Sequence, residues 1–236
     1  MKVISLVCES MQWCDIENMT ICGTNKIPFD MKPARFSAQS LWFMQSDITC
    51  EFDVDDCHDV KKSLVFETDK LISHKHKTRL IANWWPARFN PRSIDPLAVN
   101  TEGKQTKVVK EPEAWQYPVL LDFLKKEFYN SDYKWLIYWS TIGHVECSNC
   151  RHPTEQGVPV NISKTATEWL TLINQQILPL VQRDTVILIH GDHNSGRRDC
   201  KNTNGFILHT MNVSFRQPAG WKEYREVVRS CLSSGL

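Results

Sequence analysis

Apolar residues along the chain form short runs and helical stripes, most clearly in the second half. Val3–Val7 and Thr185–Ile189 are almost continuously apolar, which is typical of strands buried on both faces of a sheet. Before the second run, apolar residues at helical spacing follow Ser163 or Thr165, either of which can cap a helix. A helix, a buried strand and a polar loop in this order are typical of an α/β domain.

Weaker patterns predict the remaining elements. The predicted strands are Leu41–Phe52, Ser63–Glu67, Thr78–Trp85 and Lys134–Trp139, and the predicted helices are Val119–Phe128 and Gly220–Cys231. The polar segment Asp95–Trp115 contains a glycine and prolines in and around it, which indicates an excursion from the fold.

Composition narrows the functional classes. The chain has 236 residues, of which 42% are hydrophobic, enough for one domain with a substantial core. A formal net charge of +1 argues against a nucleic-acid partner. No apolar run is long enough to span a bilayer, so the sequence predicts no association with a membrane. The nine cysteines are irregularly spaced and follow no secretory signal, so we expect reduced thiols and a cytoplasmic protein.

The polar loop His190–Arg198 directly follows the second buried strand. Ligand sites in α/β sheets lie at the carboxyl ends of strands, so this loop is where a site is expected. Within it, His190 and Arg197 form a His-x₆-Arg pattern that resembles the signature loop of the protein tyrosine phosphatases, His-Cys-x₅-Arg.

Three further stretches carry the same resemblance. The stretch His152–Pro159 is similar to the acid loop of that family, Trp-Pro-Asp-x-x-Gly-Val-Pro, and Asn83–Ser93 is a second candidate for that loop. Phe215–Tyr224 resembles the family's glutamine-bearing stretch, and Val3–Glu9 resembles one of its strands. The resemblance implies an α/β fold with a mixed central sheet flanked by helices. It also implies one domain over residues 1–236, lacking the family's N-terminal part and carrying an insertion within 95–160.

The resemblance implies a pseudophosphatase that no longer catalyses dephosphorylation. Gly191 stands where the family has its nucleophilic cysteine, and Thr154 or Ala87 stands where it has the aspartic acid that donates a proton. The implied role is a module that needs no cofactor and binds a protein partner, including a tyrosine-phosphorylated one. The candidate phosphate-binding residues are His190, Gly191, Ser195, Gly196 and Arg197.

Two alternatives remain open from the residues themselves. His190, Asp192 and His193 follow a strand and could hold a metal that activates water, as in a metal-dependent hydrolase. A zinc-stabilised binding module is the other, built around Cys147 and Cys150 with two neighbouring histidines. The candidate ligands of its metal are His144, Cys147, Cys150 and His152, and a remote residue such as Cys57, His58 or Cys200 could replace either histidine.

Overall fold

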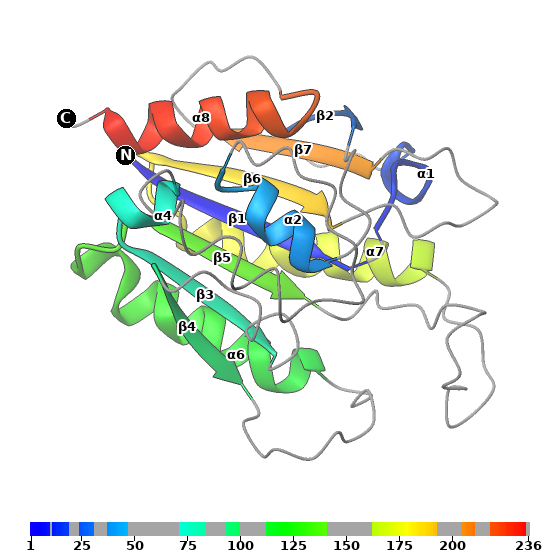
Figure 1. The fold of residues 1–236 in the computed structure, drawn as a ribbon. Coiled ribbons are helices and arrows are strands. Elements are labelled where there is room, and N and C mark those ends of the chain that lie inside the picture. The colour runs from blue at the N-terminus through cyan, green and yellow to red at the C-terminus, as the bar shows by residue number, and fades with distance from the viewer. Residues whose placement is uncertain are drawn as a thin grey trace.

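The computed structural model has a seven-stranded sheet in the order β2-β7-β6-β1-β5-β3-β4 (Figure 1). The structure describes residues 1–9, 11–18, 24–30, 37–46, 71–83, 93–99, 112–140, 162–192, 204–210 and 218–234. The strands are β1 (Lys2–Cys8), β2 (Thr24–Phe29), β3 (Thr78–Asn83), β4 (Ile94–Val99), β5 (Trp135–Ser140), β6 (Thr185–Gly191) and β7 (Asn204–Thr210). The helices are α1 (Trp13–Ile16), α2 (Ser37–Phe43), α4 (Ile72–Lys75), α6 (Pro112–Lys126), α7 (Ile162–Leu172) and α8 (Trp221–Ser233).

Five neighbouring strands, from β6 through β1, β5 and β3 to β4, run parallel to one another. Strand β7 pairs antiparallel with β6, and β2 pairs antiparallel with β7, so the complete sheet is mixed. Every residue of β5 and of β6 is buried. This burial explains the apolar runs in the sequence, because central parallel strands are covered on both faces.

Both outermost strands contain a proline, Pro28 in β2 and Pro96 in β4. Proline has no backbone N–H to give to a neighbouring strand and is therefore tolerated mainly at the edges of sheets. The two prolines limit further strand pairing at either edge.

Helices cover both faces of the sheet. Figure 1 shows α2, α4 and α8 in front of it and α6 and α7 behind it. Alternate residues of the central strands join two separate cores, so that Val3 and Leu188 lie in the core under α8, while Ile4 and Ile187 lie in the opposite one. This alternation is the two-residue period of a strand.

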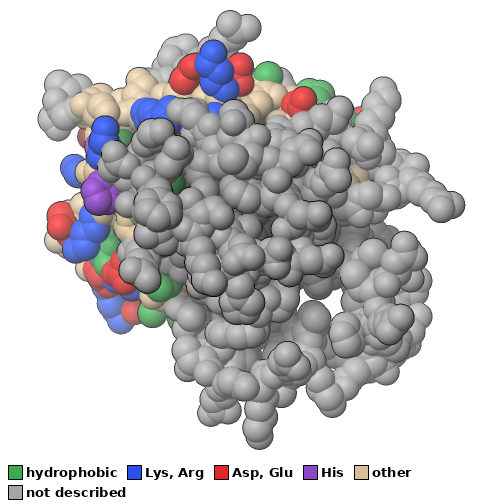
Figure 2. Space-filling model, viewed as in Figure 1, with side chains coloured by type: hydrophobic (Ala, Val, Ile, Leu, Met, Phe, Trp, Pro, Cys, Tyr) green, Lys and Arg blue, Asp and Glu red, His purple; other side chains and the backbone are tan. Residues whose placement is uncertain are grey.

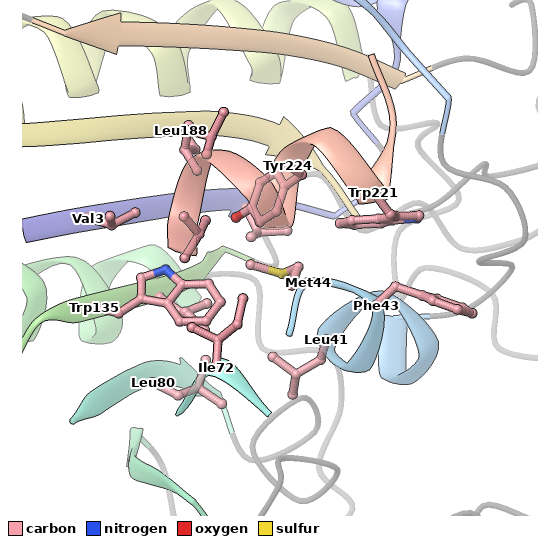
Figure 3. Packing of buried hydrophobic residues seen from close by; sticks show 14 of the residues in the cluster. Val3, Leu41, Phe43, Met44, Ile72, Leu80, Trp135, Leu188, Trp221 and Tyr224 are labelled. Carbon is pink, nitrogen blue, oxygen red and sulfur yellow. The ribbon is translucent and has the colours of Figure 1, made fainter. Parts of the chain in front are cut away.

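The core on the α8 face is rich in aromatic side chains. Figure 3 shows Trp135 and Leu188 of the sheet on the two sides of Tyr224 of α8, with Phe43 of α2 near Trp221. The ring centroids of Trp221 and Tyr224 lie 5.7 Å apart in an edge-to-face arrangement. This packing fixes the first turn of α8 near the carboxyl end of β6, where both rings also contact His190.

The structure confirms the strands predicted near residues 3–7, 78–83, 134–139 and 185–189, and the C-terminal helix. The α/β class with a mixed sheet flanked by helices is also confirmed. The strand predicted at Leu41–Phe52 is wrong at its start, since the apolar run Leu41–Phe43 ends helix α2. A short apolar run has no periodicity that separates a buried strand from a buried helix.

The predicted excursion Asp95–Trp115 is also wrong in part. Its first residues belong to β4, and its last ones belong to α6, which begins at Pro112. The predicted strand Ser63–Glu67 lies outside the described residues.

None of the helices in the described part of the chain combines the length and the apolarity needed to span a bilayer. On the coloured part of the surface in Figure 2, acidic and basic side chains are interspersed, which agrees with the small net charge.

We expect Leu188→Ala to lower the free energy of unfolding by about 2 to 5 kcal/mol, since it opens a cavity in a fully buried part of the core. The matched control is Leu178→Ala. Leu178 is only half-buried, so its substitution should lower the free energy of unfolding clearly less. Urea denaturation of the full chain measures both changes. Equal losses for the two variants would contradict the assignment of Leu188 to the core.

Candidate functional site at the carboxyl edge of the sheet

Two carboxylates lie where β1 and β6 end. Glu9 directly follows β1, and Asp192 directly follows β6. The last paired residues of these strands are Cys8 and Gly191, so Glu9 and Asp192 occupy the next register position on adjacent strands. Adjacent strands are about 4.8 Å apart. Glu9 and Asp192 are 3% and 0% exposed, so two acidic residues are buried at the ends of neighbouring strands.

The backbone that carries these carboxylates is held from neighbouring elements. The Glu9 N–H donates to the carbonyl of Ser140 at the end of β5, over 2.9 Å. The buried hydroxyl of Ser40 in α2 donates to the carbonyl of Asp192. The ends of β1 and β6 are therefore tied both to the next strand and to the helix above the sheet.

A chain of buried side chains leads to the same edge. The Trp135 indole N–H donates to Ser5 Oγ over 3.0 Å, and Ser5 Oγ lies 2.6 Å from the hydroxyl of Tyr224. That hydroxyl lies 3.4 Å from His190 Nε2, and His190 Nδ1 contacts the Gly191 carbonyl. An indole can only donate and a carbonyl can only accept, so Ser5 Oγ accepts from Trp135 and His190 Nδ1 carries a proton. This arrangement accommodates a neutral His190 whose Nε2 accepts from the Tyr224 hydroxyl.

The surroundings of His190 favour this neutral form. Its ring is fully buried and packs against Phe29, Trp221 and Tyr224. Burial lowers the pKa of His190 from 6.5 to about 4, although the Gly191 carbonyl and the charge of Asp192 act in the opposite direction. Burial likewise raises the pKa of Tyr224, so its hydroxyl stays protonated.

The structure brings together only part of the predicted site. His190 and Gly191 are the last two residues of β6, and Asp192 follows them. The other predicted site residues lie outside the described ranges: Ala87, His144, Cys147, Cys150, His152, Thr154, His193, Ser195, Gly196 and Arg197. Their proposed roles in phosphate or zinc binding stay predictions.

Sequence reasoning missed Glu9 as a site residue. The signal was present, because Glu9 is a charged residue directly after a buried apolar strand, as Asp192 is. What the sequence did not show is that β1 and β6, far apart along the chain, are neighbours in the sheet.

Glu9 and Asp192 are suitable ligands for a divalent cation. Carboxylate oxygens bind magnesium, calcium, manganese and zinc, and a cation would offset two negative charges buried side by side. Within the described ranges, no three His, Cys, Asp or Glu side chains form a group that could hold a metal. The carboxylate pair therefore fits a metal but supplies only part of a coordination shell.

The sequence matches no described protein family and no curated protein. Several solved structures share its fold. A protein in the alkaline phosphatase superfamily from Vibrio parahaemolyticus has a TM-score of 0.62 and 10% identity, over 98% of this chain and 66% of that one. The soluble domain of lipooligosaccharide phosphoethanolamine transferase A from Neisseria meningitidis has a TM-score of 0.56 and 14% identity, over 98% and 86%. A phosphoglycerol transferase from Streptococcus pyogenes, in complex with sn-glycerol-1-phosphate, has a TM-score of 0.52 and 9% identity, over 100% and 79%.

These structures correct the family resemblance. The chain has the fold of alkaline phosphatase superfamily proteins and not that of the protein tyrosine phosphatases. The assignment as a tyrosine pseudophosphatase is therefore wrong, and so is the phosphotyrosine-binding function drawn from it. The physical reason lies in β6, because His190 is a core residue inside the strand and Gly191 ends that strand.

The two alternative functions do not match the similar structures either. In the hydrolase alternative, His190 was a metal ligand. Both nitrogens of its ring are instead engaged inside the core, by the Gly191 carbonyl and the Tyr224 hydroxyl. The zinc module around Cys147 and Cys150 falls outside the described residues, and nothing in the similar structures supports it.

We expect the free energy of unfolding to decrease as the pH is lowered, because of His190. The unfolded chain takes up a proton near pH 6.5, whereas the folded chain keeps His190 neutral down to about pH 4. This contribution is complete above pH 6.5 and is lost as the pH falls toward 4, at up to about 1.4 kcal/mol per pH unit. Denaturation between pH 4 and 8 measures the slope. His190→Gln should flatten it over this range, and an unchanged slope would contradict a buried neutral histidine.

We expect Ser40→Ala to lower the free energy of unfolding by about 1 kcal/mol, because the Asp192 carbonyl loses a buried hydrogen bond. Ser46→Ala is the control, since Ser46 is also buried but bonds only the Trp42 carbonyl one turn earlier. Hydrogen exchange of the β6 amides should rise in the Ser40 variant alone. Equal exchange in both variants would show that α2 does not hold the end of β6.

Proposed function

We propose that this chain is a phosphotransfer domain, which acts on a phosphate ester at the carboxyl edge of its sheet. Glu9 and Asp192 are the proposed ligands of a divalent cation there. The observation that carries the proposal is the pair of buried carboxylates at neighbouring register positions of β1 and β6. Further ligands would have to come from other parts of the chain.

The chemistry of phosphate esters supports this assignment. A phosphate ester is an anion, so two carboxylates without a cation would repel it. A bound divalent cation supplies the positive charge that neutralises the phosphate oxygens as a phospho-group is transferred. The role of the protein side chains is then to hold the two carboxylates at fixed positions and to keep the ends of β1 and β6 from moving.

The similar structures support the substrate class. All three are named for phosphate chemistry: a phosphoethanolamine transferase, a phosphoglycerol transferase and a member of the alkaline phosphatase superfamily. Low identities make this a likeness of fold, so the phosphate-ester substrate rests on the fold and the carboxylate pair together. The proposed reaction is transfer of the phospho-group to an alcohol.

The test uses the full chain freed of metal and then titrated with Mn²⁺ or Zn²⁺ in a calorimeter. We expect binding by the wild type, and a rise in its melting temperature with metal, because a ligand of the folded state stabilises that state. Glu9→Gln and Asp192→Asn should lose both effects. Asp122→Asn is the control, since Asp122 is exposed on α6 and pairs with Lys126.

Activity is measured with p-nitrophenyl esters of phosphate, phosphoethanolamine and phosphoglycerol, with glycerol as the acceptor. We expect a metal-dependent release of p-nitrophenol and a glycerol adduct seen by mass spectrometry, both lost in Glu9→Gln and Asp192→Asn. Failure of the wild type to bind metal would overturn the site. Metal binding without turnover of any of these esters would overturn the phosphotransfer reaction.

A further inference from the structure

Two tryptophans of β5 make the same contact with β1 at its two ends. Trp135 pairs in register with Val3 and donates its indole N–H to Ser5 Oγ. Trp139 pairs in register with Val7 and donates its indole N–H to Glu9 Oε1 over 3.2 Å.

Each indole therefore reaches two residues further along β1 than its register partner. The two contacts are equivalent in geometry and in burial, because both tryptophans are 0% exposed and both lie in the core on the α8 face. They differ in what they hold. Trp135 holds a serine in the middle of the sheet, and Trp139 holds the carboxylate at its edge.

We infer that Trp139 is a positioning residue, which fixes the Glu9 carboxylate for cation binding at the end of β1. This inference rests on the function proposed above. The indole N–H can only donate, so it holds a carboxylate oxygen in a defined place without competing for the cation. Groups that hydrogen-bond to a metal's ligands orient them, and their loss typically weakens metal affinity about 10- to 100-fold.

The chain provides its own matched control. Trp139→Phe and Trp135→Phe each remove one buried indole from the same strand and the same face. We expect both variants to lose comparable stability, whereas Trp139→Phe alone binds Mn²⁺ or Zn²⁺ about 10- to 100-fold more weakly in the calorimeter. In the Glu9→Gln background, Trp139→Phe should cause no further loss of metal affinity, because the carboxylate it holds is already gone.

A spectroscopic measurement separates positioning from simple structural support. The full chain is labelled with ¹⁵N in its nine tryptophans, and the two phenylalanine variants assign the indole signals of Trp135 and Trp139. On addition of Zn²⁺, the indole N–H signal of Trp139 should shift, because its acceptor becomes a metal ligand. The signal of Trp135, which donates to Ser5, should stay in place.

The outcomes distinguish the inference from the proposed function. A wild type that binds no metal overturns the proposed function and, with it, the inference. A wild type that binds metal while the Trp139 signal stays fixed, or while the two phenylalanine variants bind equally well, overturns the inference alone. Metal binding with a shifted Trp139 signal and a selective loss in Trp139→Phe supports both.

Discussion

The burial of two like charges at the ends of β1 and β6 is the constraint on which the site depends. Glu9 and Asp192 are almost completely removed from water, and removal of a charge from water is costly unless polar partners replace the water. At this edge the fold supplies such a partner to the Glu9 carboxylate and also anchors the backbone of Asp192. An indole N–H contacts the Glu9 carboxylate, and a helix hydroxyl binds the backbone of Asp192.

One hydrogen-bonded set of buried polar side chains lies on the α8 face of the sheet. Ser5, Trp135, His190 and Tyr224 all lie between the central strands and α8. The alternate residues of the same strands, such as Ile4 and Leu6 of β1, belong to the opposite core. Helix α8 does not only cover the sheet. Its Tyr224 hydroxyl links Ser5 to His190 in the hydrogen-bond chain that ends at the Gly191 carbonyl. Its packing and the geometry of the strand ends are physically coupled.

The sequence predicted the central strands well because their composition is dictated by burial on both faces. It could not predict their order, and the order is what pairs Glu9 with Asp192. The two residues have equivalent positions after buried strands, but each was visible only as a single acidic residue. The role of Ser40 was hidden for a related reason, since the sequence predicts no helix at Ser40 and its contact with Asp192 is tertiary.

The incorrect family resemblance has a specific structural origin in β6. From the sequence alone, the apolar run of the strand ends at Ile189, so the His-x₆-Arg pattern places His190 as the first loop residue. The strand in fact continues through Gly191, and the two-residue period places His190 on the same buried face as Leu188. At this position the His190 side chain makes its hydrogen bonds inside the core and does not reach the edge of the sheet. The first side chain able to act at the edge is the next one on that face after the strand ends, which is Asp192.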